Sequence, residues 1–403
     1  MDDTRKIDWV FLLGFLLIPL YSLPEVLGRA RRCEKTGIIT LCLFFAILAF
    51  LIVPTYDAAN HGHWAWTTFQ TGLFWSYNSS HNDLYLVYLE YAILSLGLKF
   101  HYVIFVTVLF SAFPFWCMYY QVAKEESLEN QKKLFIIFLL LFPFVNTMCG
   151  LRYFTAVSWL TYCNYLLLYQ NNFKKAVIPL AVVSMIHFAI VVQIIVLLFS
   201  FITKIKLGKY NTLIIVLSLC LLSVTFVNQM MPYMYEYFPA DKVDQYSDTG
   251  YMDVLEDQNL NFYISYWIKH STWLPLSLIA LFLYYHKVFE YKLFPSFWCM
   301  LLLWAVGSGF TTLEYRWGRI AALFFFLCFF IESIKNYELP EKFYRLFVSL
   351  HIIRYFLEIY GMKSYLQISN HLVYLLFMPY PMLLCMPYDF SVYHYIWQFF
   401  IRH

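Results

Sequence analysis

The feature that most constrains this chain is a long series of apolar runs separated by short polar segments. Several runs, such as 100–122 and 318–334, reach or approach the ~20 residues that a helix needs to cross the hydrocarbon core of a bilayer. They are continuous rather than alternating, which argues against the strands of a membrane barrel. Only 13% of the 403 residues are charged. We therefore expect an all-α, polytopic membrane helix bundle of roughly 11–14 helices in a single transmembrane domain spanning 1–403.

Composition also excludes several classes of function. The net charge of +3 implies no nucleic-acid partner. The nine cysteines show no C-x-x-C spacing, so neither a disulfide framework nor a zinc site is expected. Phosphate-binding, dinucleotide-binding and metalloprotease motifs are absent, and we expect no cofactor and no metal site.

The distribution of Lys and Arg predicts the orientation of the chain, because these residues collect on the cytoplasmic side of a membrane. Loops 29–35, 171–175 and 204–209 are basic and are predicted to be inside. Segment 55–82 has no Lys or Arg, and segment 231–268 has a single lysine. These two segments are therefore predicted to be outer loops, and the N-terminus is predicted to be outside.

Residues 176–203 form an apolar stretch whose two flanks both carry cytoplasmic-type lysines. A single crossing cannot return to the side from which it started, so we expect a broken or re-entrant segment here. Pro179 and His187 are the candidate break points. Irregular backbone at membrane depth is tolerated only where it is buried in protein or lines a wet cavity. This interpretation places His187 deep in the bundle.

Three arginines interrupt the apolar pattern. Arg152 lies in Gly150-Leu151-Arg152-Tyr153, and Arg316 and Arg319 lie in a second polar interruption, all between long apolar runs. Ionisable residues at membrane depth usually mark a pathway or a site. Because guanidinium groups grip phosphate well, we predict that these three bind a diphosphate at the outer face. The alternative is that they snorkel to lipid headgroups as interfacial anchors.

Three further residues are candidates for a general base: His187, Asp57 and Glu90. A neutral imidazole accepts a proton from a hydroxyl near neutral pH. Asp57, His61 and His63 are also spaced so that they could bind a metal ion, but no fourth ligand is evident. For Asp57 we therefore favour the role of a carboxylate that orients the substrate. For Glu90 the structural alternative is an ion pair with one of the arginines.

The chain resembles the EpsG family of bacterial exopolysaccharide polymerases, which are similar in role to Wzy-type O-antigen and capsule polymerases. The resemblance rests on Tyr56-Asp57, Gly150-Leu151-Arg152, Ile186-His187 and the pair Arg316 and Arg319, and it covers most of residues 1–335. The chain departs from the family pattern at three places. Tyr153 stands where a glutamine often follows the arginine, Ala189 stands where a serine often follows the histidine, and Pro54 stands where glycine is usual.

The resemblance implies a GT-C/Wzy-type helical fold with broken or re-entrant segments. It also implies a multi-pass glycosyltransferase of the bacterial cytoplasmic (inner) membrane. Such an enzyme transfers a growing glycan from undecaprenyl diphosphate to a lipid-linked repeat unit at the outer face. Implied partners are the undecaprenyl-diphosphate-linked oligosaccharide, membrane lipid, and chain-length regulator and flippase proteins.

Two other classes stay open on the residues alone. A flippase or transporter for lipid-linked oligosaccharide would use the same arginines to carry the diphosphate, and broken helices suit transporters as well. A membrane acyltransferase would use His187, although no acidic motif and no second histidine motif accompanies that histidine.

Overall fold

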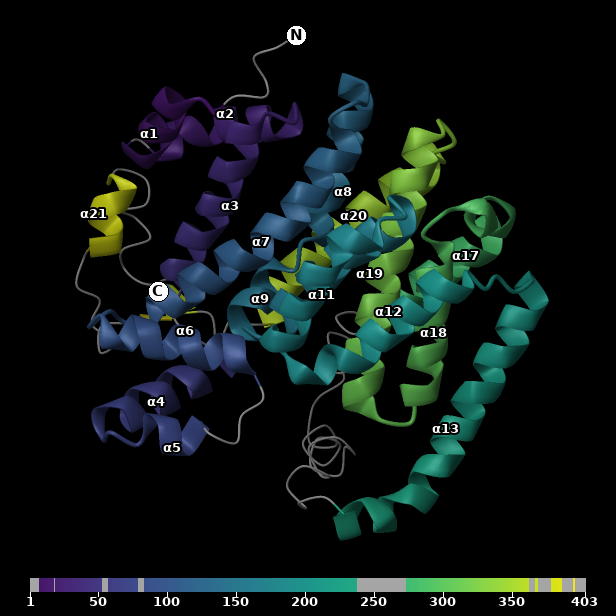
Figure 1. Cartoon of the computed structure of the whole chain (residues 1–403). Coiled ribbons are helices and arrows are strands. Elements are labelled where there is room, and N and C mark those ends of the chain that lie inside the picture. The colour runs from purple at the N-terminus through teal and green to yellow at the C-terminus, as the bar shows by residue number, and fades with distance from the viewer. Residues whose placement is uncertain are drawn as a thin grey trace, which may run out of the picture. The chain divides into compact units, whose positions relative to one another are not determined.

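In the residues that it describes, the computed structural model of the chain consists almost entirely of α-helices and confirms the predicted all-α helix bundle (Figure 1). A two-residue antiparallel pairing of β1 (Gln367–Ile368) with β2 (His394–Tyr395) accompanies the helices. The residues that the structure describes are 7–17, 19–52, 57–78, 83–237, 273–361, 367–368, 378–385 and 394–395.

The chain divides into two compact units, which are described separately below. The first unit comprises residues 1–163, 174–191 and 340–403, and the second comprises residues 164–173 and 192–339. The predicted single transmembrane domain with two outer loops stays a prediction. Of those loops, 55–82 contains two helices in its described part, and 231–268 lies outside the described residues from position 238 onward.

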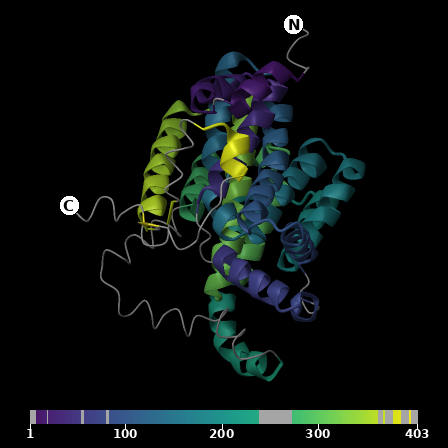
Figure 2. The same ribbon diagram turned by 90° about the vertical axis from the view of Figure 1, so that its left-hand side faces the viewer.

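The first unit is built around the long helix α7. Its helices are α1 (Trp9–Leu17), α2 (Pro19–Arg31), α3 (Lys35–Phe50), α4 (Asp57–Gln70), α5 (Phe74–Asn78), α6 (Leu84–Ser95), α7 (His101–Ala123), α8 (Leu128–Leu141), α9 (Phe144–Cys149), α10 (Tyr153–Asn164), α11 (Phe173–Ile186), α20 (Glu341–Gly361) and α21 (Tyr380–Cys385). Helices α3, α6, α8 and α9 all pack against α7. Helix α21 packs on α1 and α3 (Figure 2), and α20 packs on α8.

Large aromatic side chains fill the centre of the first unit. Trp116, Tyr119, Phe138 and Phe142 are each almost fully buried. Trp116 and Tyr119 meet edge to face with ring centroids 5.6 Å apart, a favourable arrangement for aromatic pairs. Tyr119 also donates its hydroxyl hydrogen to the carbonyl of Arg31 at 2.9 Å, which ties α7 to the end of α2.

The second unit packs four long helices together. They are α13 (Lys209–Tyr237), α17 (Trp273–Glu290), α18 (Phe294–Gly307) and α19 (Thr311–Lys335), preceded by the π-helical turn η1 (Tyr165–Tyr169) and by α12 (Val191–Thr203). Helix α18 packs against both α13 and α19, and α17 packs against α19. Phenylalanines form the core, among them Phe297 and Phe325, whose ring centroids are 4.9 Å apart.

Four helical segments in the described part of the chain are long and apolar enough to cross a membrane. They are His101–Ala123, Leu128–Cys149, Lys209–Phe226 and Leu313–Lys335. Shorter apolar helices of 10–17 residues accompany them, such as Leu84–Ser95 and Phe294–Gly307. By the length and composition of these helices the chain is a membrane protein.

The predicted break in 176–203 is confirmed at His187. Helix α11 ends at Ile186, and His187 is extended, with φ −153° and ψ 113°. A single 3₁₀ turn, η2 (Phe188–Ile190), follows before α12 begins. The other candidate break point, Pro179, lies inside α11. An apolar run that looks continuous in the sequence is therefore two short helices with irregular backbone between them.

Candidate functional site

The carboxylate of Asp83 joins three donors that lie far apart in the sequence. Arg152 Nη1 donates to Oδ2 at 2.7 Å, and the backbone N–H of Phe188 donates to Oδ1 at 2.9 Å. His187 Nδ1 lies 3.0 Å from Oδ1 and 3.1 Å from Oδ2. All of these residues belong to the first unit. One buried carboxylate thus holds a guanidinium, an imidazole and the broken backbone after α11.

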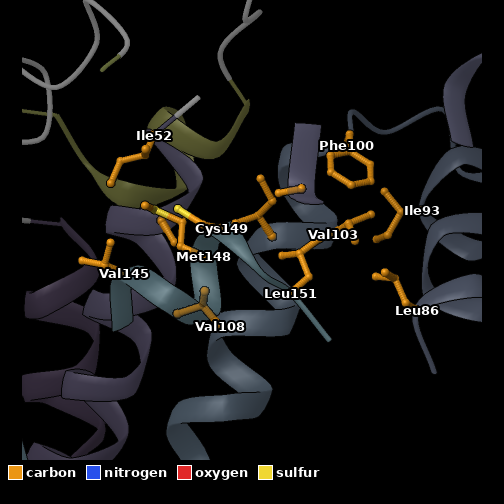
Figure 3. Close-up of a cluster of buried hydrophobic side chains, with 13 residues drawn as sticks. Ile52, Leu86, Ile93, Phe100, Val103, Val108, Val145, Met148, Cys149 and Leu151 are labelled. Carbon is orange, nitrogen blue, oxygen red and sulfur yellow. The ribbon is translucent and has the colours of Figure 1, made fainter. Parts of the chain in front are cut away.

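An apolar cluster (Figure 3) packs together the segments that carry Asp83 and Arg152. The cluster joins Leu86 and Ile93 of α6 to Val103 of α7, to the end of α9, and to Leu151. Leu86 is one helical turn after Asp83, and Leu151 directly precedes Arg152. Because Leu86 and Leu151 are buried in this cluster, the positions of the adjacent Asp83 and Arg152 are fixed as well.

One aromatic stack and two hydrogen bonds link α7 to α6 and α10 and add to this packing. The rings of Tyr85 and Phe110 stack with centroids 4.9 Å apart, and Trp159 donates its indole N–H to the carbonyl of Phe110 at 3.0 Å. Ser111 donates to Ser158 at 2.9 Å between two buried hydroxyls. Helix α10, which begins immediately after Arg152, is thereby held against the helix that follows α6.

Asp83 occupies the N-cap position of α6 but does not cap it. Aspartate at this position normally accepts a hydrogen bond from an N–H of the first helical turn. Here the side chain makes no such bond. Its oxygens face Arg152, His187 and Phe188 instead, so a residue type that usually stabilises a helix end serves a tertiary contact.

The contact with Asp83 fixes the chemistry of His187. An ionised carboxylate only accepts hydrogen bonds, so Nδ1 carries the proton that points to Asp83. In the neutral ring Nε2 then presents a lone pair. No hydrogen-bond partner of Nε2 is found among the described residues. A carboxylate that orients an imidazole and stabilises its protonated form is the arrangement used by acid–base catalysts.

Asp83 precedes α6 and lies outside the four candidate membrane-spanning helices. Its burial by itself raises the pKa of the carboxyl group, because charge is disfavoured away from water. The hydrogen bond and charge of His187, the Phe188 N–H and the charge of Arg152 act in the opposite direction and prevail. They lower the pKa of Asp83 from 3.8 to about 2, so the carboxylate is ionised at neutral pH.

Glu90 lies two helical turns after Asp83 on α6 and has a different partner. Its side chain is 2% exposed, and Oε1 lies 3.2 Å from Nδ1 of His61 on α4. A spacing of seven residues corresponds to about 10 Å along a helix, so Glu90 and Asp83 do not act on the same atom. One partner of Glu90 in the structure is therefore a histidine, and the predicted ion pair with an arginine stays a prediction.

The remaining predicted residues are not brought to Asp83 by any described contact. Asp57 begins α4, but its side chain lies outside the described residues. Arg316 and Arg319 lie one turn apart on α19 in the second unit, and the Arg319 guanidinium stacks on Tyr315 at 4.4 Å. Their convergence with Arg152 on one diphosphate stays a prediction. Among the described residues no cluster of His, Cys, Asp or Glu side chains is arranged to hold a metal ion.

Comparisons with known proteins identify no relative of this chain. No protein-family model matches the sequence, and neither a curated protein nor a solved structure shows significant similarity to it. The interpretation of the site therefore rests on its residues and their geometry.

Sequence reasoning found Arg152 and His187 but missed Asp83 as a site residue. Its only signal was an acid at the start of an apolar run with no lysine or arginine nearby in the sequence. Because such an acid is the usual N-cap of a helix, the pattern favours a local role. The three donors lie 69 to 105 residues away, so no local spacing reveals them.

Proposed function

We propose that this chain is a polysaccharide polymerase that uses lipid-diphosphate-linked glycans in a bacterial cytoplasmic membrane, similar to the EpsG family. The observation that carries the proposal is the Arg152–Asp83–His187 constellation beside a helix break in a membrane protein. It supplies a fixed positive charge and an oriented imidazole within one site. Those are the two groups that a glycosyl transfer from a lipid diphosphate requires without a metal.

In the proposed reaction, a hydroxyl oxygen of the incoming repeat unit attacks the anomeric carbon of the growing glycan. The bond from that carbon to the diphosphate oxygen breaks, and undecaprenyl diphosphate leaves with the electron pair. Nε2 of His187 takes the hydroxyl proton, and Asp83 stabilises the imidazolium that results. Arg152 stabilises the negative charge of the leaving diphosphate. Direct displacement of this kind inverts the anomeric configuration.

The test is purified protein incubated with lipid-linked repeat units and no nucleotide sugar, with glycan length as the measurement. We expect longer glycans with the unchanged protein. His187→Gln should slow elongation by about 10²–10⁴-fold, the usual contribution of a general base. Arg152→Ala should abolish polymer and leave single repeat units.

The matched control is Arg345→Ala, which removes an exposed arginine that pairs only with Glu341 of its own helix among the described ion pairs. Elongation at the unchanged rate is expected for that variant. Normal chain length in Arg152→Ala, or normal elongation in His187→Gln, would reject the roles assigned to these residues.

The His187–Asp83 contact keeps a membrane acyltransferase as a second candidate. The sequence shows no acidic motif beside His187, but the fold supplies one in space. An oriented imidazole also activates a hydroxyl for attack on an acyl carbonyl. Transfer of a labelled acyl group to a glycan, with no change in glycan length, would favour this class. Unchanged glycan with altered leaflet exposure would favour a flippase.

A further inference from the structure

A cavity with an apolar lining is formed by residues of α13, α17 and α18 of the second unit. Its volume is about 110 Å³. Val216 and Leu217 of α13, Leu281 of α17 and Trp304 of α18 line its walls, and Lys209 lies at one end. Nothing in the proposed glycan chemistry uses this cavity, because Asp83, Arg152 and His187 all belong to the first unit.

The length of the cavity matches one leaflet of a bilayer. Its α13 wall runs from Lys209 to Cys220, about 16 Å at the helical rise of 1.5 Å per residue. Half of a hydrocarbon core ~30 Å thick is about 15 Å. The first residues of α13, Lys209–Phe226, also form one of the candidate membrane spans, so the cavity lies along a helix that is long and apolar enough to cross a membrane. These dimensions suit an acyl chain that enters from one leaflet.

The α13 wall of the cavity begins at Lys209, whose side chain carries a positive charge. Lys209 lies with Nζ 5.1 Å from the centre of the Phe282 ring. Lys204 and Lys206 lie in the same short loop before α13. Among the described residues no carboxylate comes within ion-pairing distance of these three lysines. Nearby Thr212 is not a competing ligand, because its hydroxyl accepts the indole N–H of Trp298 at 3.3 Å.

We propose that this cavity binds an anionic phospholipid, with one acyl chain between α13, α17 and α18 and its phosphate at Lys209. Apolar walls select the chain, and Lys209 selects a negatively charged headgroup, with Lys204 and Lys206 shortly before it in the sequence. The loop 204–209 is predicted to face the cytoplasm, and the cytoplasmic leaflet carries anionic lipids. The lipid fastens α13, which exposes apolar residues such as Leu221, to the rest of the second unit.

The experiment measures retained lipid by native mass spectrometry of the full-length protein purified in detergent. Phosphatidylglycerol is titrated against phosphatidylcholine of identical acyl chains. We expect one phosphatidylglycerol to be retained at least tenfold more tightly than phosphatidylcholine. Lys209→Gln should remove this preference by removing the headgroup contact. Leu217→Trp should weaken retention of both lipids, because the indole fills the cavity while the charge stays.

The control variant is Lys287→Gln, which removes a lysine of α17 that does not line the cavity and pairs with Glu338 at 3.6 Å. It should retain phosphatidylglycerol like the unchanged protein. If Lys209→Gln and Lys287→Gln lost phosphatidylglycerol equally, the preference would come from general surface charge, and the proposal would be overturned. Equal retention of the two phospholipids would also overturn it, and so would stronger retention of undecaprenyl phosphate, which would assign the cavity to a carrier lipid. None of these outcomes depends on polymerase activity.

Discussion

Asp83 gathers interactions that are costly to lose. Its side chain is 11% exposed and that of Arg152 is 22% exposed, so both charges are largely removed from water. Such a pair is stable only while each charge keeps its partner, because an uncompensated buried charge is expensive. The same carboxylate also satisfies the Phe188 N–H, which has left the hydrogen-bonding pattern of a helix. The charge of Arg152 and the backbone N–H of Phe188 therefore both depend on the Asp83 side chain for a partner.

We predict that Asp83→Asn lowers the free energy of unfolding by about 3 kcal/mol, because the guanidinium of Arg152 loses its negative partner. Thermal or denaturant unfolding in a single detergent measures the effect. The control is Glu129→Gln, which removes an exposed acid paired with Lys133 and should change stability by less than about 0.5 kcal/mol. Equal effects of the two substitutions would contradict a special role for Asp83.

The contribution of Asp83 to stability should depend on pH with a definite sign. Its pKa is lowered from 3.8 to about 2 on folding, so its ionised form stabilises the fold. That contribution is fully present above about pH 4 and is lost as the pH falls toward 2. We therefore expect the difference in melting temperature between the unchanged protein and Asp83→Asn to persist from pH 7 to pH 5, because Asp83 stays ionised over that range. Below pH 4 the difference should shrink, and a difference that already shrinks at pH 6 would point to another group.

At the scale of elements, the break after α11 has no local cause in its sequence. Neither proline nor glycine occurs at positions 184–190. The His187 N–H still bonds to the carbonyl of Val183 at 3.3 Å, and the Phe188 N–H then turns to Asp83. A carboxylate from another helix thus ends α11 by offering its backbone a better acceptor than the next helical carbonyl.

The α2–α3 hairpin shows the opposite case, in which one residue type is required locally. A Cβ added at Gly37 would lie 2.3 Å from the backbone nitrogen of Ala30 and 2.5 Å from the carbonyl carbon of Arg29. Backbone atoms cannot move aside as the end of a side chain can. Glycine therefore permits α3 to approach the end of α2 closely.

We predict that Gly37→Ala destabilises the protein by about 1–3 kcal/mol, the usual cost of forcing extra volume into a packed core. Melting temperature in detergent is the measurement. Gly14→Ala is the matched control, because nothing lies within 4 Å of a Cβ at that helical position. It should leave stability unchanged or raise it by up to about 1 kcal/mol through higher helix propensity. A neutral Gly37→Ala would contradict the close contact of α2 with α3.

At the scale of the whole molecule, helix length bears on topology. Helix α11 has 14 residues and α12 has 13, or about 21 Å and 20 Å of rise. Each is shorter than the ~30 Å hydrocarbon core, so neither crosses the membrane alone. Basic loops at 171–175 and 204–209 flank the two helices. From the basic loops on both flanks we predict that segment 176–203 enters and leaves on the cytoplasmic side.

Alkaline phosphatase fusions test this topology, because the enzyme is active only outside the cytoplasm. We expect low activity for fusions after Asn172 and after Lys206, since positive loops stay inside. A fusion after Asn78, in the predicted outer segment without Lys or Arg, should be active and serves as the control. High activity at only one of the first two positions would show that 176–203 crosses the membrane completely.

The sequence predicted much of the fold and part of the site. Arg152 and His187 stand out because charged or polar groups are energetically costly within apolar runs. Such an interruption can be recognised from the sequence alone. Glu90 stands out for the same reason, but its partner His61 does not follow from any spacing. For Arg316 and Arg319 the sequence predicts a ligand, and that prediction is still to be tested by mutation.

The sequence by itself determined that this chain is helical and apolar enough for a membrane. These properties follow from hydropathy, charge and run length, which are local quantities. Only the tertiary structure decided that Asp83 meets Arg152 and His187, and that Glu90 meets His61. The physical reason is that pairing between distant residues is set by how α6, α7 and α9 bury their apolar faces together.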